Sequence, residues 1–168
     1  GPVPESFITT AMPNGKVAPN LARQGIRGVR QVDSTISFNY FNMEDPVVGG
    51  YTPDKVALRR AIALAMDTPR EITLILRGQA VPAQSGLMPH TVGYDPTFKS
   101  EASDYDPARA RALLDVYGYV DRDGDGWREL PDGQPLVIEK ATPSQQLYRQ
   151  RDELLRKLSS QIPGMMFQ

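Results

Sequence analysis

Apolar residues recur at helical spacing over positions 53 to 66, in the segment PDKVALRRAIALAM. The spacing i, i+4, i+7 and i+8 places one side of a helix toward a core, whereas Arg59 and Arg60 fall on other faces. Thr52, Pro53 and Asp54 supply an N-cap, a first-turn proline and an acid near the positive end of the helix. The predicted inward positions are Leu58, Ile62, Ala65 and Met66.

A second helix is predicted directly after the first. Asp67 ends the first helix, and Thr68–Glu71 has the sequence of a capping box. Gly78 marks the end of this second helix, because glycine accepts the left-handed conformation of a helix terminus. Its apolar positions are Ile72, Ile75 and Leu76.

Two more helices follow. The pair Asp106 and Pro107 predicts the start of a third helix, and Gly118 its end. The segment Ser144 to Ile162 has the apolar spacing of a fourth helix. The inward residues predicted for the third helix are Ala110, Leu113, Leu114 and Tyr117.

The strand pattern, an alternation of apolar and polar residues, is clearest in Ser34 to Asn42. Pro135 to Ala141 also reads as a strand, and Met165 to Phe167 as the start of another. Strands and helices in this order predict an α/β fold. We expect two parts, a loosely organised segment at 1–33 and an α/β region at 34–168, in which a long loop runs from Gln79 to Ser103.

Composition narrows the functional classes. With 168 residues, 40% of them hydrophobic, the chain can bury a core. Lys and Arg total 19 and Asp and Glu total 20, so the net charge of -1 gives no general attraction to nucleic acid or to an anionic membrane. The chain has no cysteine, no apolar run of membrane-spanning length and no signal-peptide pattern at its start. The interrupted strand at its end suggests a fragment of something longer.

The segment DRDGDGWRELPD at 121–132 matches the order of ligands in a calcium loop. Its carboxylates stand at positions 1, 3 and 5 of the loop, and the glycine of the sharp turn follows at position 6. Trp127 stands at position 7, where the backbone carbonyl is the ligand. Asp132 stands where a bidentate Glu is usual, and Arg122 and Arg128 offset part of the negative charge. A Gly/Asp turn between helix and strand is the alternative interpretation. The candidate calcium ligands are Asp121, Asp123, Asp125, Trp127 and Asp132.

Enzymatic motifs are missing from the sequence. It contains no nucleophile elbow, P-loop, dinucleotide-binding glycine pattern or helical zinc motif. His90 is the single histidine, so it has no second histidine or cysteine for a metal or nucleophile constellation. Tyr40 and Asn42 end the first predicted strand, where α/β proteins often place binding groups.

Seven segments in order resemble the family 5 solute-binding proteins: SFNYFN, VALRRAIALAMD, REITLILRGQAVPAQSGLMP, GYDP, YDPARARALLDVYGY, DRDGDGWRELPDG and PLVIEKAT. The resemblance implies part of one lobe of a two-lobed periplasmic binding protein, with a mixed sheet flanked by helices. It also implies a non-enzymatic subunit that delivers peptides or related small solutes to an inner-membrane ABC permease. In the family the first strand and the loop that ends at residue 90 lie near the cleft. The ligand-binding candidates are therefore Tyr40, Asn42, Gln84, Ser85 and His90.

Two other functional classes stay open at this point. One is a free-standing calcium-binding module built on the Asp-rich loop. The other is a small hydrolase that uses carboxylates, for which a convergent pair in a closed pocket would be the evidence.

Overall fold

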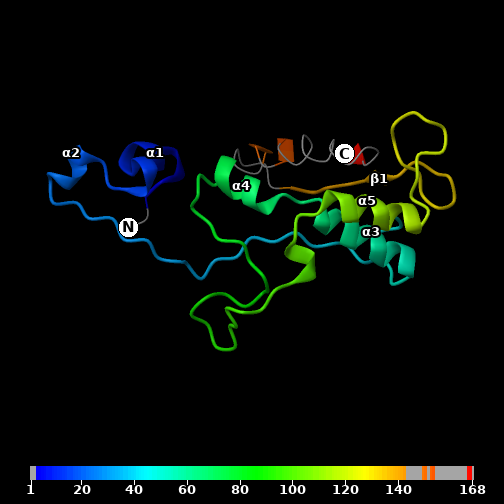
Figure 1. Ribbon diagram of the computed structural model, residues 1–168, viewed down its shortest axis with the longest axis horizontal. Helices are drawn as coiled ribbons and strands as arrows, with labels where there is room; N and C mark the ends of the chain where they lie inside the picture. Colours follow the sequence, from blue (N-terminus) through cyan, green and yellow to red (C-terminus); the bar gives the residue numbers. More distant parts are fainter. Residues whose placement is uncertain (1–2, 143–148, 151, 154–165, 168) are drawn as a thin grey trace.

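The computed structural model describes residues 3–142, 149–150, 152–153 and 166–167 (Figure 1). Short helices come first, followed by an extended segment, a helical centre and a parallel strand pair. The elements are η1 (Glu5–Phe7), α1 (Ile8–Ala11), η2 (Pro13–Gly15), α2 (Pro19–Ala22), α3 (Pro53–Leu64), α4 (Thr68–Leu74), η3 (Glu101–Ser103), α5 (Pro107–Val116), β1 (Val137–Ile138) and β2 (Met166–Phe167).

The helices α3 and α5 pack against each other and carry the core. The apolar side of α3 buries Leu58 completely, and α5 buries Leu114 completely. The removal of these side chains from water is the main stabilising contribution. The buried cluster comprises Val48, Leu58, Ala61, Ile62, Leu64, Ala110, Leu114, Tyr119, Leu136 and Ile138.

The three helices predicted from caps are confirmed, with corrections to one N-cap, to one inward residue and to the end of α4. Asp106 caps α5 as expected, because its Oδ1 accepts the Arg109 amide at 2.9 Å. The capping box at Thr68 is wrong, since Asp67 is the N-cap of α4 and accepts the Arg70 amide at 3.0 Å. Tyr117 was predicted inward, but it lies in the non-helical C-cap of α5 and is 36% exposed.

α4 ends earlier than predicted, at Leu74 with Ile75 as its C-cap, so Ile75 and Leu76 lie outside the helix and Gly78 lies in the turn that follows. Gly78 has a φ of 73° and its amide donates to the carbonyl oxygen of Ile72 at 2.8 Å. Such a bond satisfies a carbonyl that the helix end leaves without a partner.

The predicted strand at Ser34 to Asn42 is wrong for the part of the chain that the structure describes. The segment is without regular secondary structure and has no strand alongside it among those residues. Phe38 and Tyr40 are 68% and 82% exposed instead of facing a core. A strand needs a partner for its backbone groups, and alternation alone does not supply one.

The sheet in the described residues is one parallel pair. Val137 of β1 pairs with Met166 of β2, and Ile138 pairs with Phe167. Both segments were expected as strands, so their existence is confirmed, whereas the mixed sheet is not. The predicted helix Ser144 to Ile162 lies largely outside the described residues.

The N-terminal segment forms a small unit at one end of the molecule, and the Asp-rich loop lies at the other end (Figure 1). Ala11 and Ala18 are buried within the N-terminal unit, and the Ala18 amide donates to the Ala11 carbonyl oxygen at 2.8 Å. Among the described residues, none of the helices combines the length and apolar character that a membrane crossing needs.

Candidate functional site

Tyr40 projects from the extended segment into solvent beside Phe38. The ring centroids of the two residues are 6.3 Å apart and the rings are tilted by 52°. Residues two apart on extended backbone share a face, and a tilted aromatic pair at this distance is favourable. The result is an exposed aromatic surface, which we call the Phe38–Tyr40 surface.

Asn42 follows at the end of the same segment, where it forms a turn. Its Oδ1 accepts the Glu44 amide at 3.1 Å. Asp45 continues the turn by accepting the amides of Val47 and Val48, each at 2.8 Å. The side chain of Asn42 thus shapes the chain between the aromatic pair and α3.

The turn is fixed to α3 by two cations. Arg59 donates from Nη1 to the carbonyl oxygens of Val48 at 2.6 Å and Gly50 at 2.9 Å. Lys55 donates to the Pro46 carbonyl oxygen. Arg59 lies on a face of α3 that the sequence pattern left polar, and together with Lys55 it holds the turn that follows Tyr40.

At the start of α3 the half-buried Asp54 lies beside the buried Tyr119. Burial, reinforced by the charge of Asp54, raises the pKa of Tyr119 to about 12. A hydrogen bond from Thr52 lowers the pKa of Asp54 below its usual value. The Tyr119 hydroxyl lies 3.5 Å from the Asp54 Oδ2, so the start of α3 is tied to the chain after α5.

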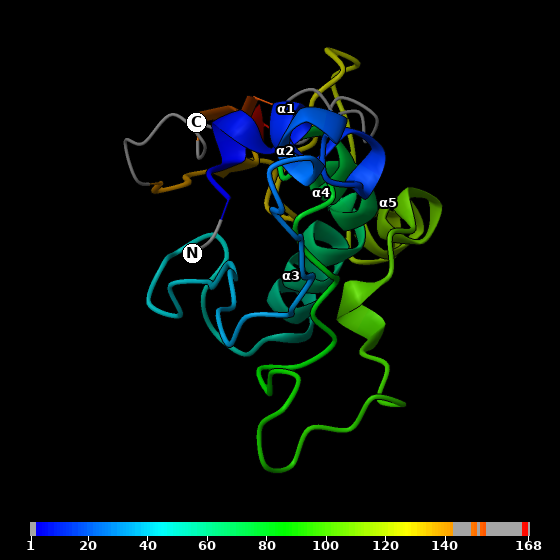
Figure 2. The same ribbon diagram turned by 90° about the vertical axis from the view of Figure 1, so that its left-hand side faces the viewer.

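The other candidates lie in the loop from 79 to 103, which projects below α3 in both views (Figure 2). Gln84 Oε1 accepts the Ser100 amide at 3.1 Å and the Ser103 hydroxyl donates to the Ala83 carbonyl oxygen at 3.3 Å, so the loop is closed at its base. Ser85 Oγ accepts the Leu87 amide at 3.1 Å. These bonds give the loop a defined shape.

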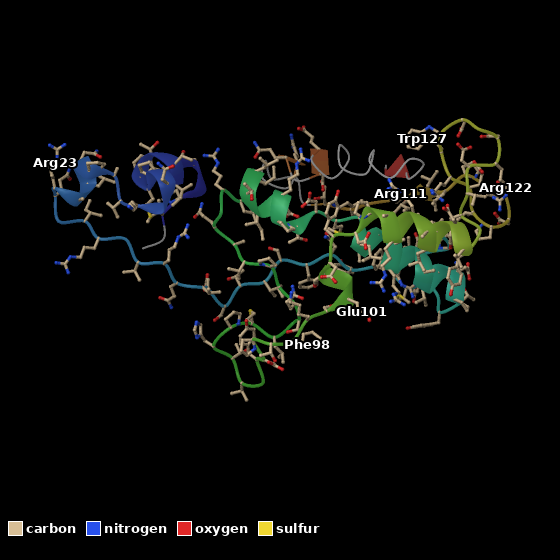
Figure 3. The ribbon with its side chains drawn as sticks, in the orientation of Figure 1. Arg23, Phe98, Glu101, Arg111, Arg122 and Trp127 are labelled. Carbon is tan, nitrogen blue, oxygen red and sulfur yellow. The ribbon has the colours of Figure 1, made fainter. Side chains whose placement is uncertain are left out.

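His90 is exposed in this loop and has a φ of 68°. This left-handed conformation is uncommon outside glycine and asparagine. Apolar side chains are also exposed in this loop, among them Val92 at 100% and Phe98 at 49% (Figure 3).

The structure does not join the five ligand-binding candidates through hydrogen bonds. Tyr40 and Asn42 belong to the extended segment, and Gln84, Ser85 and His90 belong to the loop. In the part of the chain that is described, the bonds of each group stay within its own segment or at the base of the loop.

The Asp-rich loop gathers carboxylates as the sequence suggested. One oxygen each from Asp121, Asp123, Asp125 and Glu129 lies within 4.8 Å of the others. The loop amides also turn toward these groups: Asp121 accepts from Gly124 at 2.7 Å, and Asp125 accepts from Trp127 at 2.7 Å. Carboxylate oxygens in such a group are the ligands that calcium prefers.

The membership of this group differs from the sequence-based set. Glu129 belongs to it, although position 9 of the loop was not among the candidates. Asp132 is not part of the group, and its Oδ1 accepts the Gln134 amide at 3.0 Å in a separate turn. Trp127 is 45% exposed on the same loop (Figure 3).

The two arginines of the loop are engaged with other groups. Arg122 donates to the carbonyl oxygens of Leu130 at 2.9 Å and Gly118 at 3.0 Å. Arg128 forms an ion pair with Asp115 at 2.5 Å. The two arginines therefore fasten the loop to the end of α5 and to the next turn.

Comparison with known proteins identifies the class as a solute-binding protein. Residues 5–157 match the family described as bacterial extracellular solute-binding proteins, family 5, middle. This match spans most of the chain, and the chain belongs to this family. A search of curated proteins gave no match.

Solved structures share the fold. A periplasmic oligopeptide-binding protein of an ABC transporter from Thermotoga maritima has 24% identity and a TM-score of 0.58 over 73% of this chain. NikA from Brucella suis, in complex with Fe(III)-EDTA, has 26% identity and a TM-score of 0.54 over 67%. AppA from Bacillus subtilis, in complex with a nonapeptide, has 19% identity and a TM-score of 0.59 over 67%. The chain spans 24%, 22% and 22% of these three proteins, respectively.

Proposed function

We propose that this chain is part of the substrate-binding subunit of an ABC importer, which binds peptides or related small solutes in the periplasm. The family match over residues 5–157 is the observation that carries the proposal. The subunit is non-enzymatic, closes two lobes on its solute and presents it to an inner-membrane permease. This chain contributes part of one lobe.

The Phe38–Tyr40 surface is the best-supported solute contact in the chain. Both rings are more than two-thirds exposed, and Arg59 and Lys55 hold the turn that follows them. An exposed pair of aromatic rings can cover an apolar or planar part of a solute. The loop residues Gln84, Ser85 and His90 complete the proposed contact set from the second segment.

The test uses the full-length receptor, purified from cells and analysed by native mass spectrometry for co-purified solute. The solute so identified is then titrated against the receptor and against Tyr40→Ala. We expect affinity to fall about tenfold, as for loss of one well-buried aromatic contact. Tyr51→Ala removes another exposed tyrosine, 83% accessible, and serves as the matched control.

Two outcomes would contradict the proposal. If no small solute accompanies the receptor and a peptide pool gives no binding, the receptor function is wrong. If a solute binds but Tyr40→Ala and Tyr51→Ala behave alike, the function stands and the assignment of Tyr40 is wrong.

We also propose calcium as a weak ligand of the Asp-rich loop, supported by the four carboxylate groups gathered within 4.8 Å. Such a site would stiffen the connection between α5 and β1, since these residues lie between the two elements. Extracellular calcium modules work at dissociation constants of roughly 10⁻⁴ to 10⁻³ M. Three of these carboxylates are exposed on a loop and Glu129 is half-buried, an arrangement that favours cation binding over carboxylate-dependent hydrolysis in a closed pocket.

A further inference from the structure

Two guanidinium groups converge on one carboxylate oxygen at the base of the loop from 79 to 103. Arg60 Nη2 lies 2.8 Å from Glu101 Oε2, and Arg109 Nη2 lies 3.8 Å from the same oxygen. Arg60 comes from α3, Glu101 from η3 and Arg109 from the first turn of α5. Figure 3 shows Glu101 at the base of the projecting loop.

The three side chains border an open cavity of about 360 Å³, which Leu64 and Ser100 also line. Leu64 is 3% exposed and gives the cavity an apolar wall. The side chains of Arg60 and Arg109 are 53% and 51% exposed, so a small molecule can reach both. The cavity is distinct from the Phe38–Tyr40 surface and from the Asp-rich loop.

The charges in this cavity are only partly balanced. Two guanidinium groups against one carboxylate leave one positive charge, and Glu101 is itself 73% exposed. An ion pair that exposed contributes little to stability. An anion with two negative charges would balance both arginines, and guanidinium forks match oxyanions geometrically.

We propose that Arg60 and Arg109 form a binding site for a small, doubly charged oxyanion, in which the Glu101 carboxylate occupies the position of the ligand. The site is independent of the proposed solute contact. The incoming anion displaces Glu101, whose side chain swings into solvent, and the two arginines then bind the anion together.

The experiment is a ¹H–¹⁵N NMR titration of the whole chain with inorganic phosphate, with sodium chloride used to hold the ionic strength constant. We expect saturable shifts at the amides of Ser100, Glu101 and Arg109. Glu101→Gln removes the carboxylate that competes with phosphate for the two arginines. The dissociation constant for phosphate should therefore fall about twofold to fivefold, which is the effect expected when one exposed ion pair is lost. Arg109→Gln should weaken phosphate binding by at least as much.

Arg70→Gln is the matched control, because Arg70 is an exposed arginine on α4 that does not line the cavity. Amide spectra of each variant establish that it is folded before the titration is interpreted. Three results would overturn the proposal: equal shifts with chloride alone, an unchanged phosphate affinity in Glu101→Gln, or equal losses in Arg70→Gln and Arg109→Gln.

Discussion

The backbone amide of Asp106 donates a hydrogen bond of 2.9 Å to the carbonyl oxygen of Leu64. Leu64 is the last residue of α3, and Asp106 is the N-cap of α5. Carbonyl groups at a helix end have no partner within the helix, so this bond satisfies one of them. The end of one helix and the start of the other are fixed at the same point.

Replacement of Asp106 should show how much the cap contributes. Asp106→Ala removes the acceptor for the Arg109 amide and keeps the bond to Leu64, because that bond uses backbone atoms. We expect a loss of about 1 kcal/mol in the free energy of unfolding, measured by urea denaturation. Asp106→Asn retains a cap and should lose much less, so equal losses in the two variants would contradict the capping role.

The contact between α3 and α5 should be sensitive to cavity formation. Leu114 is fully buried, and Leu114→Ala should cost about 2 to 5 kcal/mol in unfolding free energy. Leu74→Ala makes the same chemical change on α4 at a side chain that is 54% exposed, where we expect about 0.5 kcal/mol or less. Equal urea midpoints for the two variants would contradict the assignment of the main core to the contact between α3 and α5.

Gly49 lies where no side chain fits. A Cβ atom there would stand 2.4 Å from the Asp45 carbonyl oxygen and 2.5 Å from that of Met43. Both neighbours are backbone atoms, so Gly49→Ala must shift the turn that Arg59 holds, at a cost of about 1 to 3 kcal/mol. Gly86→Ala, where nothing lies within 4 Å, is the control for thermal unfolding and should be close to neutral. If the two variants melt alike, the turn is not a tightly packed element.

Tyr119 should make the stability of the fold depend on alkaline pH. Its pKa rises from 10.0 to about 12 in the folded protein, chiefly because it is buried. A raised pKa favours the protonated folded state, so this contribution is complete below pH 10 and is lost as the pH rises toward 12. The unfolding free energy should fall by up to about 1.4 kcal/mol per pH unit in this interval.

Tyr119→Phe isolates that effect, because it keeps the ring and removes the titrating hydroxyl. The unfolding free energy of both proteins is measured by urea denaturation from about pH 9 to about pH 12, a range that begins below the pKa of an unperturbed tyrosine. It should depend less steeply on pH in the variant. Parallel curves would show that the hydroxyl ionises as freely in the folded protein as in the unfolded chain.

The Asp-rich loop can be tested with terbium, which Trp127 should sensitise. We expect emission on excitation of Trp127, competed away by calcium, with a dissociation constant of roughly 10⁻⁴ to 10⁻³ M. Asp125→Ala should abolish the emission, whereas Asp132→Ala should leave it, because Asp132 is outside the carboxylate group. The terbium concentration should reach about 1 mM, the weakest dissociation constant expected for such a site. If no emission is seen at that concentration, the loop is a turn that binds no cation.

The helices were predictable because their signals are local. Asp106 and Pro107 specify the start of α5 with atoms that lie within one turn, and Gly78 has the expected left-handed conformation in the turn after α4. Asp67 was misassigned for a related reason. The same carboxylate suits the end of one helix or the start of the next, and only the geometry of the Arg70 amide decides between them.

The extended segment and the Asp-rich loop show what local patterns omit. Tyr40 and Phe38 do share a face, as alternation implies, but whether that face is buried depends on chain elsewhere. Glu129 stands at position 9, which the calcium-loop pattern also uses, often through a water, so the sequence carried this signal and the candidate set omitted it. The convergence of Arg60, Glu101 and Arg109 joins residues from three elements, and sequence spacing carries no information about such a meeting.

The parallel pairing of Val137 with Met166 also sets an order of events during synthesis. The helices α3 and α5 lie well before β2 in the chain, so they can dock before Met166 leaves the ribosome. Bringing β1 and β2 together lowers the conformational entropy of the chain between them, and this loss precedes the hydrogen bonds that the two strands form. In a nascent chain that ends before residue 166, Leu136 and Ile138 would pack beside the helical core. The backbone of β1 would have no partner yet, so a chaperone or another strand could bind to it.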